Sequence, residues 1–173
     1  FKKEVLEVAF QDKSIDDILN MTIDDAIAFF DMHGQTKIQS KLQPLQDVGL
    51  GYVTLGQSSS TLSGGEAQRI KLATFLGKGT KSDNALFIFD EPTTGLHFHD
   101  IKKLLKSFQA LIEQGHSIIV IEHNLELIKC ADYIIDLGPE GGERGGQLVA
   151  QGTPEELVKN KSSITGTFLK GKL

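Results

Sequence analysis

The sequence predicts an α/β fold in which a mainly helical first half precedes a half built around a parallel sheet. Three apolar runs, at residues 85–89, 118–121 and 133–137, are long enough and apolar enough to be buried strands. Segments with helical spacing separate these runs, and strands that alternate with helices usually pair in parallel through right-handed crossovers. The length of 173 residues fits one domain, or a compact core with a smaller subdomain.

The first part of the chain predicts a short strand and two capped helices. In residues 6–10, Leu, Val and Phe alternate with Glu and Ala, as in a half-buried strand. Ser14 precedes residues 15–19 and is a suitable N-cap for a short helix. Thr22 is followed three positions later by Asp25, which marks the start of a second helix.

An apolar stripe from Ile38 to Val48 predicts a third helix, which the glycines within residues 49–51 should end. Pro44 lies inside this stripe. Because proline removes a backbone donor and clashes with the preceding turn, we expect it to kink or split the helix. Residues 52–55 are Tyr, Val, Thr and Leu, which favour an extended segment.

The second half adds two well-marked helices to its strands. Apolar residues from Ile101 to Ile112 recur with helical spacing, and Gly115 should end that helix. Thr153, Pro154 and Glu156 are an N-cap, a first-position proline and a capping-box acid, so they predict a last helix. The remaining predicted elements are a helix at 125–131, a glycine-rich turn region at 138–146 and a short strand at 148–150.

Composition argues against several classes of protein. A net charge of −5 argues against a strongly basic nucleic-acid-binding module. The single cysteine, Cys130, permits neither a disulfide framework nor a cysteine zinc site within the chain. No apolar run reaches the roughly 18 residues of a membrane span, and no signal peptide is recognisable. We therefore expect a cytoplasmic protein, and the initial Phe1 is typical of a segment cut from a longer one.

Ser63, Gly64, Gly65 and Glu66 form a glycine-rich turn that opens into a helix. Ser63 can cap the helix, with Glu66 at the capping-box position. The glycines let a ligand approach the backbone, and the helix N-terminus favours an anion such as a phosphate. The alternative is an ordinary capped helix after a glycine turn, which these four residues alone would favour.

Two adjacent carboxylates, Asp90 and Glu91, follow the apolar run at residues 85–89. Ligands of open α/β sheets bind at the carboxyl ends of the strands. There Asp90 can hold Mg²⁺, and Glu91 can orient or deprotonate an attacking water. The alternative is a solvated turn whose acids cap the next helix.

His123 follows the next apolar run and can reach a phosphate at the same sheet edge. On its own, a histidine satisfied by backbone groups would be the better interpretation. His97 and His99 lie two positions apart without a third ligand, which disfavours a metal site. Four basic residues that follow the glycine-rich turn can form a modest basic patch, but a solvated helix face and its following loop are the preferred interpretation: Arg69, Lys71, Lys78 and Lys81.

Residues 62–69, LSGGEAQR, closely resemble the signature motif of the ABC superfamily of ATPases, and the order of this motif before FIFDEP fits an ABC cassette. The chain is still more similar to the UvrA family of damage-recognition ATPases. That similarity rests on KLQPLQDVGLGYVTLGQSSSTLSGG, DEPTTGLHFHDI, VIEHNLELIKCADYIIDLGPEGGERGG and GTPEEL. Transporter cassettes usually carry Gln and Asp at the positions of Glu66 and His97, which also favours UvrA.

The resemblance implies a partial P-loop NTPase core of the ABC ATPase type with a parallel sheet. Residues 1–80 would be part of a helical signature subdomain. Residues 81–173 would be half of the ATPase core, with the Walker B pair, the D-loop and the switch histidine. The implied catalytic residues are Glu91 and His123. The implied nucleotide-binding residues are Ser63, Gly64, Gly65, Glu66, Gln68, Asp90 and His97, with Asp90 also holding Mg²⁺ through water.

The resemblance also implies ATP and Mg²⁺ as cofactors, with two ATPase cassettes per full-length chain and zinc bound outside this segment. The implied partners are damaged duplex DNA, a second UvrA protomer and UvrB, without a membrane. No G-x-x-x-x-G-K-[ST] loop occurs in the 173 residues, so the segment alone should be inactive. Two alternatives stay open: a transporter-type ABC cassette and a UvrA-like self-resistance protein.

Overall fold

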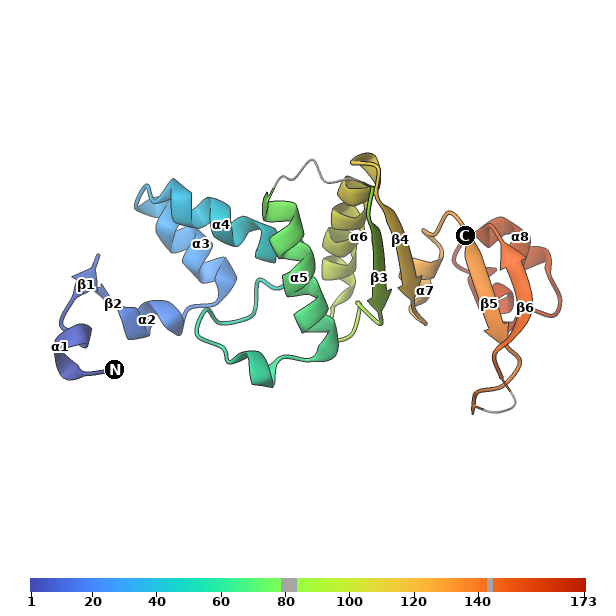
Figure 1. Ribbon diagram of the computed structural model, residues 1–173, viewed down its shortest axis with the longest axis horizontal. Coiled ribbons are helices and arrows are strands. Elements are labelled where there is room, and N and C mark those ends of the chain that lie inside the picture. Colours follow the sequence, from blue (N-terminus) through green and yellow to red (C-terminus); the bar gives the residue numbers. More distant parts are fainter. Residues whose placement is uncertain (79–83, 143–144) are drawn as a thin grey trace. The chain divides into compact units, whose positions relative to one another are not determined.

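The computed structural model describes residues 1–78, 84–142 and 145–173, which form two compact units. The first unit is Phe1–Ile121 and the second is Glu122–Leu173. Figure 1 shows the helices and strands of both units. The predicted division between residues 80 and 81 lies in the part of the chain outside the described residues, and it stays a prediction.

In the first unit, local side chains cap the starts of some of the helices. Its elements are α1 (Lys3–Leu6), β1 (Ala9–Phe10), β2 (Lys13–Ser14), α2 (Ile15–Leu19), α3 (Ile23–Met32), α4 (Thr36–Asp47), the 3₁₀ turn η1 (Ser59–Thr61), α5 (Gly64–Lys78), β3 (Leu86–Asp90), α6 (Phe98–Glu113) and β4 (Ser117–Ile121). Ser14 and Asp17 form a capping box at α2, and the Thr22 hydroxyl accepts from the Asp25 N–H at α3. Both predicted caps are confirmed.

The structure corrects three local predictions for the first 60 residues. The alternating run at 6–10 is not one strand, because α1 ends within it and only β1 remains, paired with β2. Pro44 does not split α4, which is a single helix, and a kink at Pro44 stays a prediction. Residues 52–55 do not form a strand. Thr54 makes only an isolated antiparallel bridge with Thr22, and the Ile23 N–H donates to the Val53 carbonyl at 2.9 Å.

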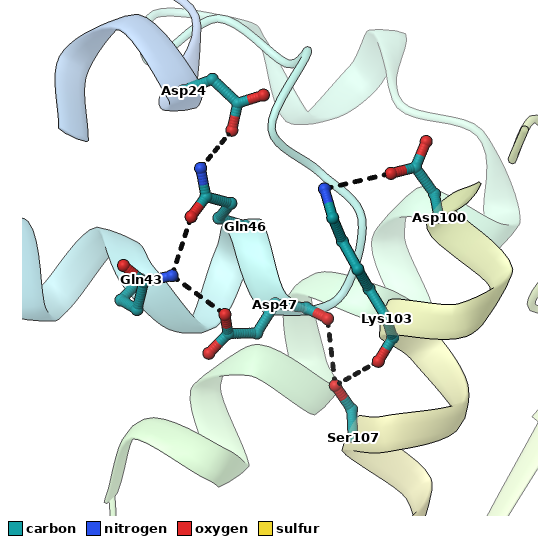
Figure 2. A network of polar contacts seen from close by, with 7 residues as sticks. All are labelled: Asp24, Gln43, Gln46, Asp47, Asp100, Lys103 and Ser107. Carbon is teal, nitrogen blue, oxygen red and sulfur yellow. Dashed lines mark hydrogen bonds and ion pairs between the residues drawn. The ribbon is translucent and has the colours of Figure 1, made fainter. Parts of the chain in front are cut away.

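Helices α3, α4 and α6 are joined by the polar network that Figure 2 shows. The Gln46 amide of α4 donates to Asp24 of α3 at 2.7 Å. The Ser107 hydroxyl of α6 donates to the backbone carbonyl of Asp47, at the end of α4, at 3.1 Å. Gln43 completes the network by donating to Gln46 at 2.8 Å and to Asp47 at 2.9 Å. One hydrogen bond therefore links α4 to α3, and another links the end of α4 to α6.

Strands β3 and β4 pair in parallel, with Ile88 opposite Ile119 (Figure 1). One face of this pair is covered: the Phe89 ring lies 4.9 Å from the ring of Phe108 in α6, between centroids. The opposite face is open, since Ile88 is 63% exposed and Ile119 is 50% exposed. The parallel pairing was predicted, but burial of these strands on both faces was not found.

The second unit contains α7 (Leu125–Ile128), β5 (Ile134–Gly138), β6 (Gln147–Gly152), α8 (Pro154–Lys159) and α9 (Ile164–Leu169). Strand β5 pairs antiparallel with β6, so the predicted parallel pairing of this third strand was wrong. A hairpin partner close in sequence replaces the expected crossover.

Thr153 and Glu156 form the predicted capping box of α8. Residues 143–144 of the predicted turn region lie outside the described residues. Across the described ranges, no helix is both long and apolar enough to cross a bilayer.

Glu126 is the acceptor of two ammonium groups in the second unit, Lys129 at 2.6 Å and Lys172 at 2.8 Å. The hydrogen bond from Lys129, followed by that from Lys172, lowers the pKa of Glu126 from 4.5 to about 2. Because the folded pKa is below the unfolded one, the stabilisation is present above pH 4.5 and is lost as the pH falls towards 2.

We therefore expect the thermal midpoint of Glu126→Gln to fall less than that of the wild type over this acid range. Circular dichroism melts at a series of pH values measure the difference. Glu7→Gln, which removes one exposed carboxylate elsewhere, is the control and should follow the wild-type curve. Parallel curves for Glu126→Gln and the wild type would contradict the assignment.

Candidate functional site

The signature turn starts α5 as the sequence predicted. The backbone N–H of Ser63 donates to the Glu66 carboxylate at 2.7 Å, and the N–H of Glu66 donates to the Ser63 hydroxyl at 3.3 Å. This capping box satisfies two donors at the helix N-terminus. Ser63 and Gly64 are exposed, so this end of α5 is open to a ligand.

The two signature glycines have different surroundings. A Cβ at Gly65 would stand 3.2 Å from the Glu91 carbonyl oxygen and 3.3 Å from Arg69 Nη1, so Gly65 permits a close approach of α5 to the acidic turn. A Cβ at Gly64 would meet no described atom within 4 Å. The described fold therefore explains a glycine at 65 and leaves room for a side chain at 64.

Gln68 joins α5 to the end of β3 by two hydrogen bonds. Its amide nitrogen donates to the carbonyl of Asp90 at 3.1 Å, and its amide oxygen accepts from the N–H of Asp90 at 3.1 Å. Both bonds go to the backbone, so they fix the position of Asp90 without involving its carboxylate. Direct nucleotide contact by Gln68 stays a prediction.

Arg69 is fully buried, so its interpretation as part of a solvated basic face was wrong. Its Nη1 donates to the carbonyl of Pro92 at 2.6 Å and to that of Thr94 at 3.2 Å. Lys71 is exposed as expected, whereas Lys81 and the side chain of Lys78 lie outside what the structure describes. Helical periodicity in α5 gives no sign of this burial, because the acceptors are backbone groups 23 and 25 positions away.

Tyr52 connects Arg69 to the signature turn. Its hydroxyl donates to Glu66 at 2.5 Å and accepts from Arg69 Nη2 at 3.4 Å. The hydrogen bond from Tyr52, and then that from the Ser63 N–H, lowers the pKa of Glu66. Burial, followed by the bond to Glu66, raises the pKa of Tyr52. These hydrogen bonds favour the carboxylate form of Glu66 at the start of α5. No motif in the sequence marks Tyr52, which lies 14 positions before Glu66.

Glu91 occupies a sharp turn immediately after β3. Its φ of +46° is in the left-handed region, which side-chain-bearing residues seldom adopt. The Glu91 N–H donates to the carbonyl of Ile121 at 2.9 Å, and its carbonyl accepts from Thr94 at 3.1 Å. Glu91 is exposed at the carboxyl end of the strand, where ligands of such sheets bind. Backbone strain of this kind concentrates at functional sites.

Comparison with known proteins shows the family of the chain. The chain is 57% identical over all 173 residues to the UvrABC system protein A of Clostridium acetobutylicum. It is 56% identical over 170 residues to the same protein of Aquifex aeolicus. The chain belongs to the UvrA family. It spans 18% of the length of each of these two relatives.

Solved structures agree with the UvrA assignment. The crystal structure of UvrA2 from Deinococcus radiodurans matches the whole chain at 42% identity with a TM-score of 0.82, over 21% of that structure. A bacterial Atm1-family ABC exporter with ATP bound matches 90% of this chain and 26% of its own, at 24% identity and a TM-score of 0.52, which indicates a shared fold. The predicted ABC ATPase fold class is confirmed. No protein-family model matches the chain.

The predicted D-loop of this UvrA segment follows the acidic turn. Gly95 has a φ of +78°, and His97 is the exposed residue that precedes α6. The His97 carbonyl accepts from the N–H of Asp100 at 2.9 Å, as the first turn of α6 requires. His97 is thus an exposed residue at the start of α6, a few positions after the acid pair. Its nucleotide-binding role stays a prediction.

His123 belongs to the second unit, just before α7. It is exposed, its N–H donates to the Glu122 carboxylate at 2.9 Å, and Asn124 caps α7. The structure thus brings the signature turn and the acid pair together within the first unit. The predicted meeting of His123 with Glu91 stays a prediction.

Asp90 fits magnesium as a single protein ligand. Over the described ranges, no three His, Cys, Asp or Glu side chains gather as a metal site. Mg²⁺ commonly binds through one or two carboxylates together with water and phosphate oxygens. Asp90 is exposed at the end of β3 and its backbone is fixed by Gln68, so it suits that role.

Proposed function

We propose that this segment supplies part of an ATP-hydrolysing site in a damage-recognition ATPase of nucleotide excision repair. Its contribution is the signature turn, the Asp90–Glu91 pair, the D-loop with His97 and the switch histidine His123. The observation that carries the proposal is the Gln68 amide, which binds both backbone groups of Asp90. These bonds link α5, whose N-terminus is exposed, to the end of β3 that carries the two exposed acids.

The proposed role of each residue in ATP hydrolysis follows from where charge develops during the reaction. Glu91 accepts the proton of the attacking water, and His123 contacts the terminal phosphate. Asp90 would hold Mg²⁺, which supplies charge neutralisation at the phosphate oxygens. The N-terminus of α5, with Ser63 and Gly64 exposed, favours a phosphate group through its N–H groups and dipole. Gly65, Glu66 and Gln68 hold that end in place.

The whole protein's partners follow from the family. We propose that the full-length protein acts on damaged duplex DNA, pairs with a second UvrA protomer and works with UvrB. We also propose that it binds ATP, Mg²⁺ and, outside this segment, zinc. A transporter-type cassette is the weaker candidate, because the similarity to the exporter is 24% against 57% for a UvrABC system protein A.

Gly64→Asp in the full-length protein tests the signature role. We expect ATP-driven dimerisation to be lost while initial nucleotide binding remains, because a negative charge would repel the phosphate at the helix N-terminus. The fold should persist, since the Cβ has open space among the described atoms and an acid suits the first turn. Ser63→Arg, which adds bulk at the same end, should behave alike.

Analytical ultracentrifugation with and without ATP measures the outcome. Gly64→Ala is the matched control, because it adds the Cβ without the charge and should retain most of the dimerisation. ATP-dependent dimers at wild-type concentration in Gly64→Asp would refute the signature role.

A further inference from the structure

Arg69 is a buried cation of α5. It is completely buried, yet its hydrogen-bond acceptors are carbonyl oxygens and a phenol, not a carboxylate. Within the described residues its Nε has no hydrogen-bond partner. Burying a charge with such partners costs stability, and apolar replacements of buried ions are often neutral or stabilising. A side chain kept under these conditions points to a geometric requirement.

We propose that Arg69, assisted by Gln68, is a positioning residue that holds the turn carrying Glu91 in its reactive geometry. This inference rests on the proposed role of Glu91 in hydrolysis. Gln68 binds the backbone on the strand side of Glu91, at Asp90. Arg69 binds the backbone on its other side, at Pro92 and Thr94.

The conformation of Glu91 requires hydrogen bonds to the backbone on both of its sides. A side-chain-bearing residue at a φ of +46° persists only where the surroundings fix it from several directions. Four backbone groups between residues 90 and 94 are held by two consecutive side chains of α5. Nη1 of Arg69 donates to both carbonyls, and Nη2 donates to the Tyr52 hydroxyl. A lysine at 69 would keep the charge but lose the planar guanidinium that spans these three acceptors.

The same arginine extends the link to the signature turn. Arg69 donates to Tyr52, Tyr52 donates to Glu66, and Glu66 accepts from the N–H of Ser63. The backbone groups that would face a phosphate and the turn that would activate water are therefore parts of one hydrogen-bonded chain. A phosphate bound at the signature turn would steady the position of Glu91 through this chain.

The test uses the full-length protein with the other cassette's hydrolysis disabled. Arg69→Lys keeps the charge, and Gln68→Met keeps the size but loses both amide bonds. We expect each to lower kcat for MgATP by about 10-fold or more, with KM changed less than about threefold, because small misplacement of a reacting group is costly. Lys71→Met, an exposed change on the same helix, is the control and should leave both constants unchanged.

A double-mutant cycle separates positioning from general damage. In a Glu91→Gln background, adding Arg69→Lys or Gln68→Met should lower the residual rate by less than about twofold, because the group to be positioned is gone. An equal loss in both backgrounds, or an unchanged kcat in both single variants, overturns the inference. If Arg69→Lys does not fold, Gln68→Met decides alone. Normal turnover in Glu91→Gln itself would instead sink the proposed role of Glu91.

Discussion

Replacing Glu91 by Gln in the full-length protein should slow steady-state ATP hydrolysis by about 10²- to 10⁴-fold while ATP binding persists. An amide can still hydrogen-bond the attacking water but cannot take its proton. The turn should tolerate the change, because its backbone bonds to Ile121 and Thr94 do not involve the side chain. Phosphate release under single-turnover and steady-state conditions measures the effect, with the other cassette inactivated.

Glu113→Gln is the matched control for Glu91→Gln, since it makes the same chemical change on an exposed part of α6. It should hydrolyse ATP at the wild-type rate. ATP binding by Glu91→Gln is followed by calorimetry, which separates a chemical defect from lost affinity. Turnover within a few-fold of the wild type would show that another group acts on the water.

The isolated 173-residue chain should hydrolyse no ATP above background and bind MgATP only weakly. Phosphoryl transfer depends on positioning and charge stabilisation, much of which the Walker A backbone and lysine supply. That loop motif does not occur in this sequence. Phosphate release and calorimetry on the purified chain, beside the full-length protein as a positive control, measure both quantities. Micromolar binding or steady hydrolysis would refute the phosphate-anchoring argument.

The same chain should also self-associate through the open face of β3 and β4. Leu86, Ile88, Ile119 and Ile121 are each at least half exposed there, and contiguous apolar surface promotes association. Light scattering across a concentration series detects it. The double substitution Ile88→Ser and Ile119→Ser should reduce the apparent mass, whereas Met32→Ser, at an exposed apolar residue elsewhere, should not.

Sequence was a good guide to the helix caps, which depend on neighbours three positions apart. The caps at Ser14, Thr22, Ser63 and Thr153 need only a hydroxyl and the N–H groups that follow it. The end of α6 at Gly115 is equally local, and its φ of +91° is one that glycine adopts readily.

Long-range partners explain what the sequence could not predict. Residues 52–55 have strand-forming side chains, but the backbone of Val53 and Leu55 forms hydrogen bonds with that of Ile23 and Met21. Strand β5 follows a helix as a parallel strand would, but β6 lies only a hairpin away. The burial of Arg69 could not be predicted, because its acceptors are backbone carbonyls and every residue has one.

The fastening of α4 to α6 has a practical consequence for experiments at different ionic strengths. The bonds drawn between helices in Figure 2 join amides, a hydroxyl, a backbone carbonyl and a carboxylate, and none of them is an ion pair. Its one ion pair, Lys103 with Asp100 at 3.2 Å, lies within α6. Dissolved salt screens pairs of charges far more than neutral hydrogen bonds. A potassium chloride titration of the full-length protein should therefore leave the hydrogen bonds between these helices intact. The salt dependence should report instead on the ionic contacts of the protein with phosphate groups.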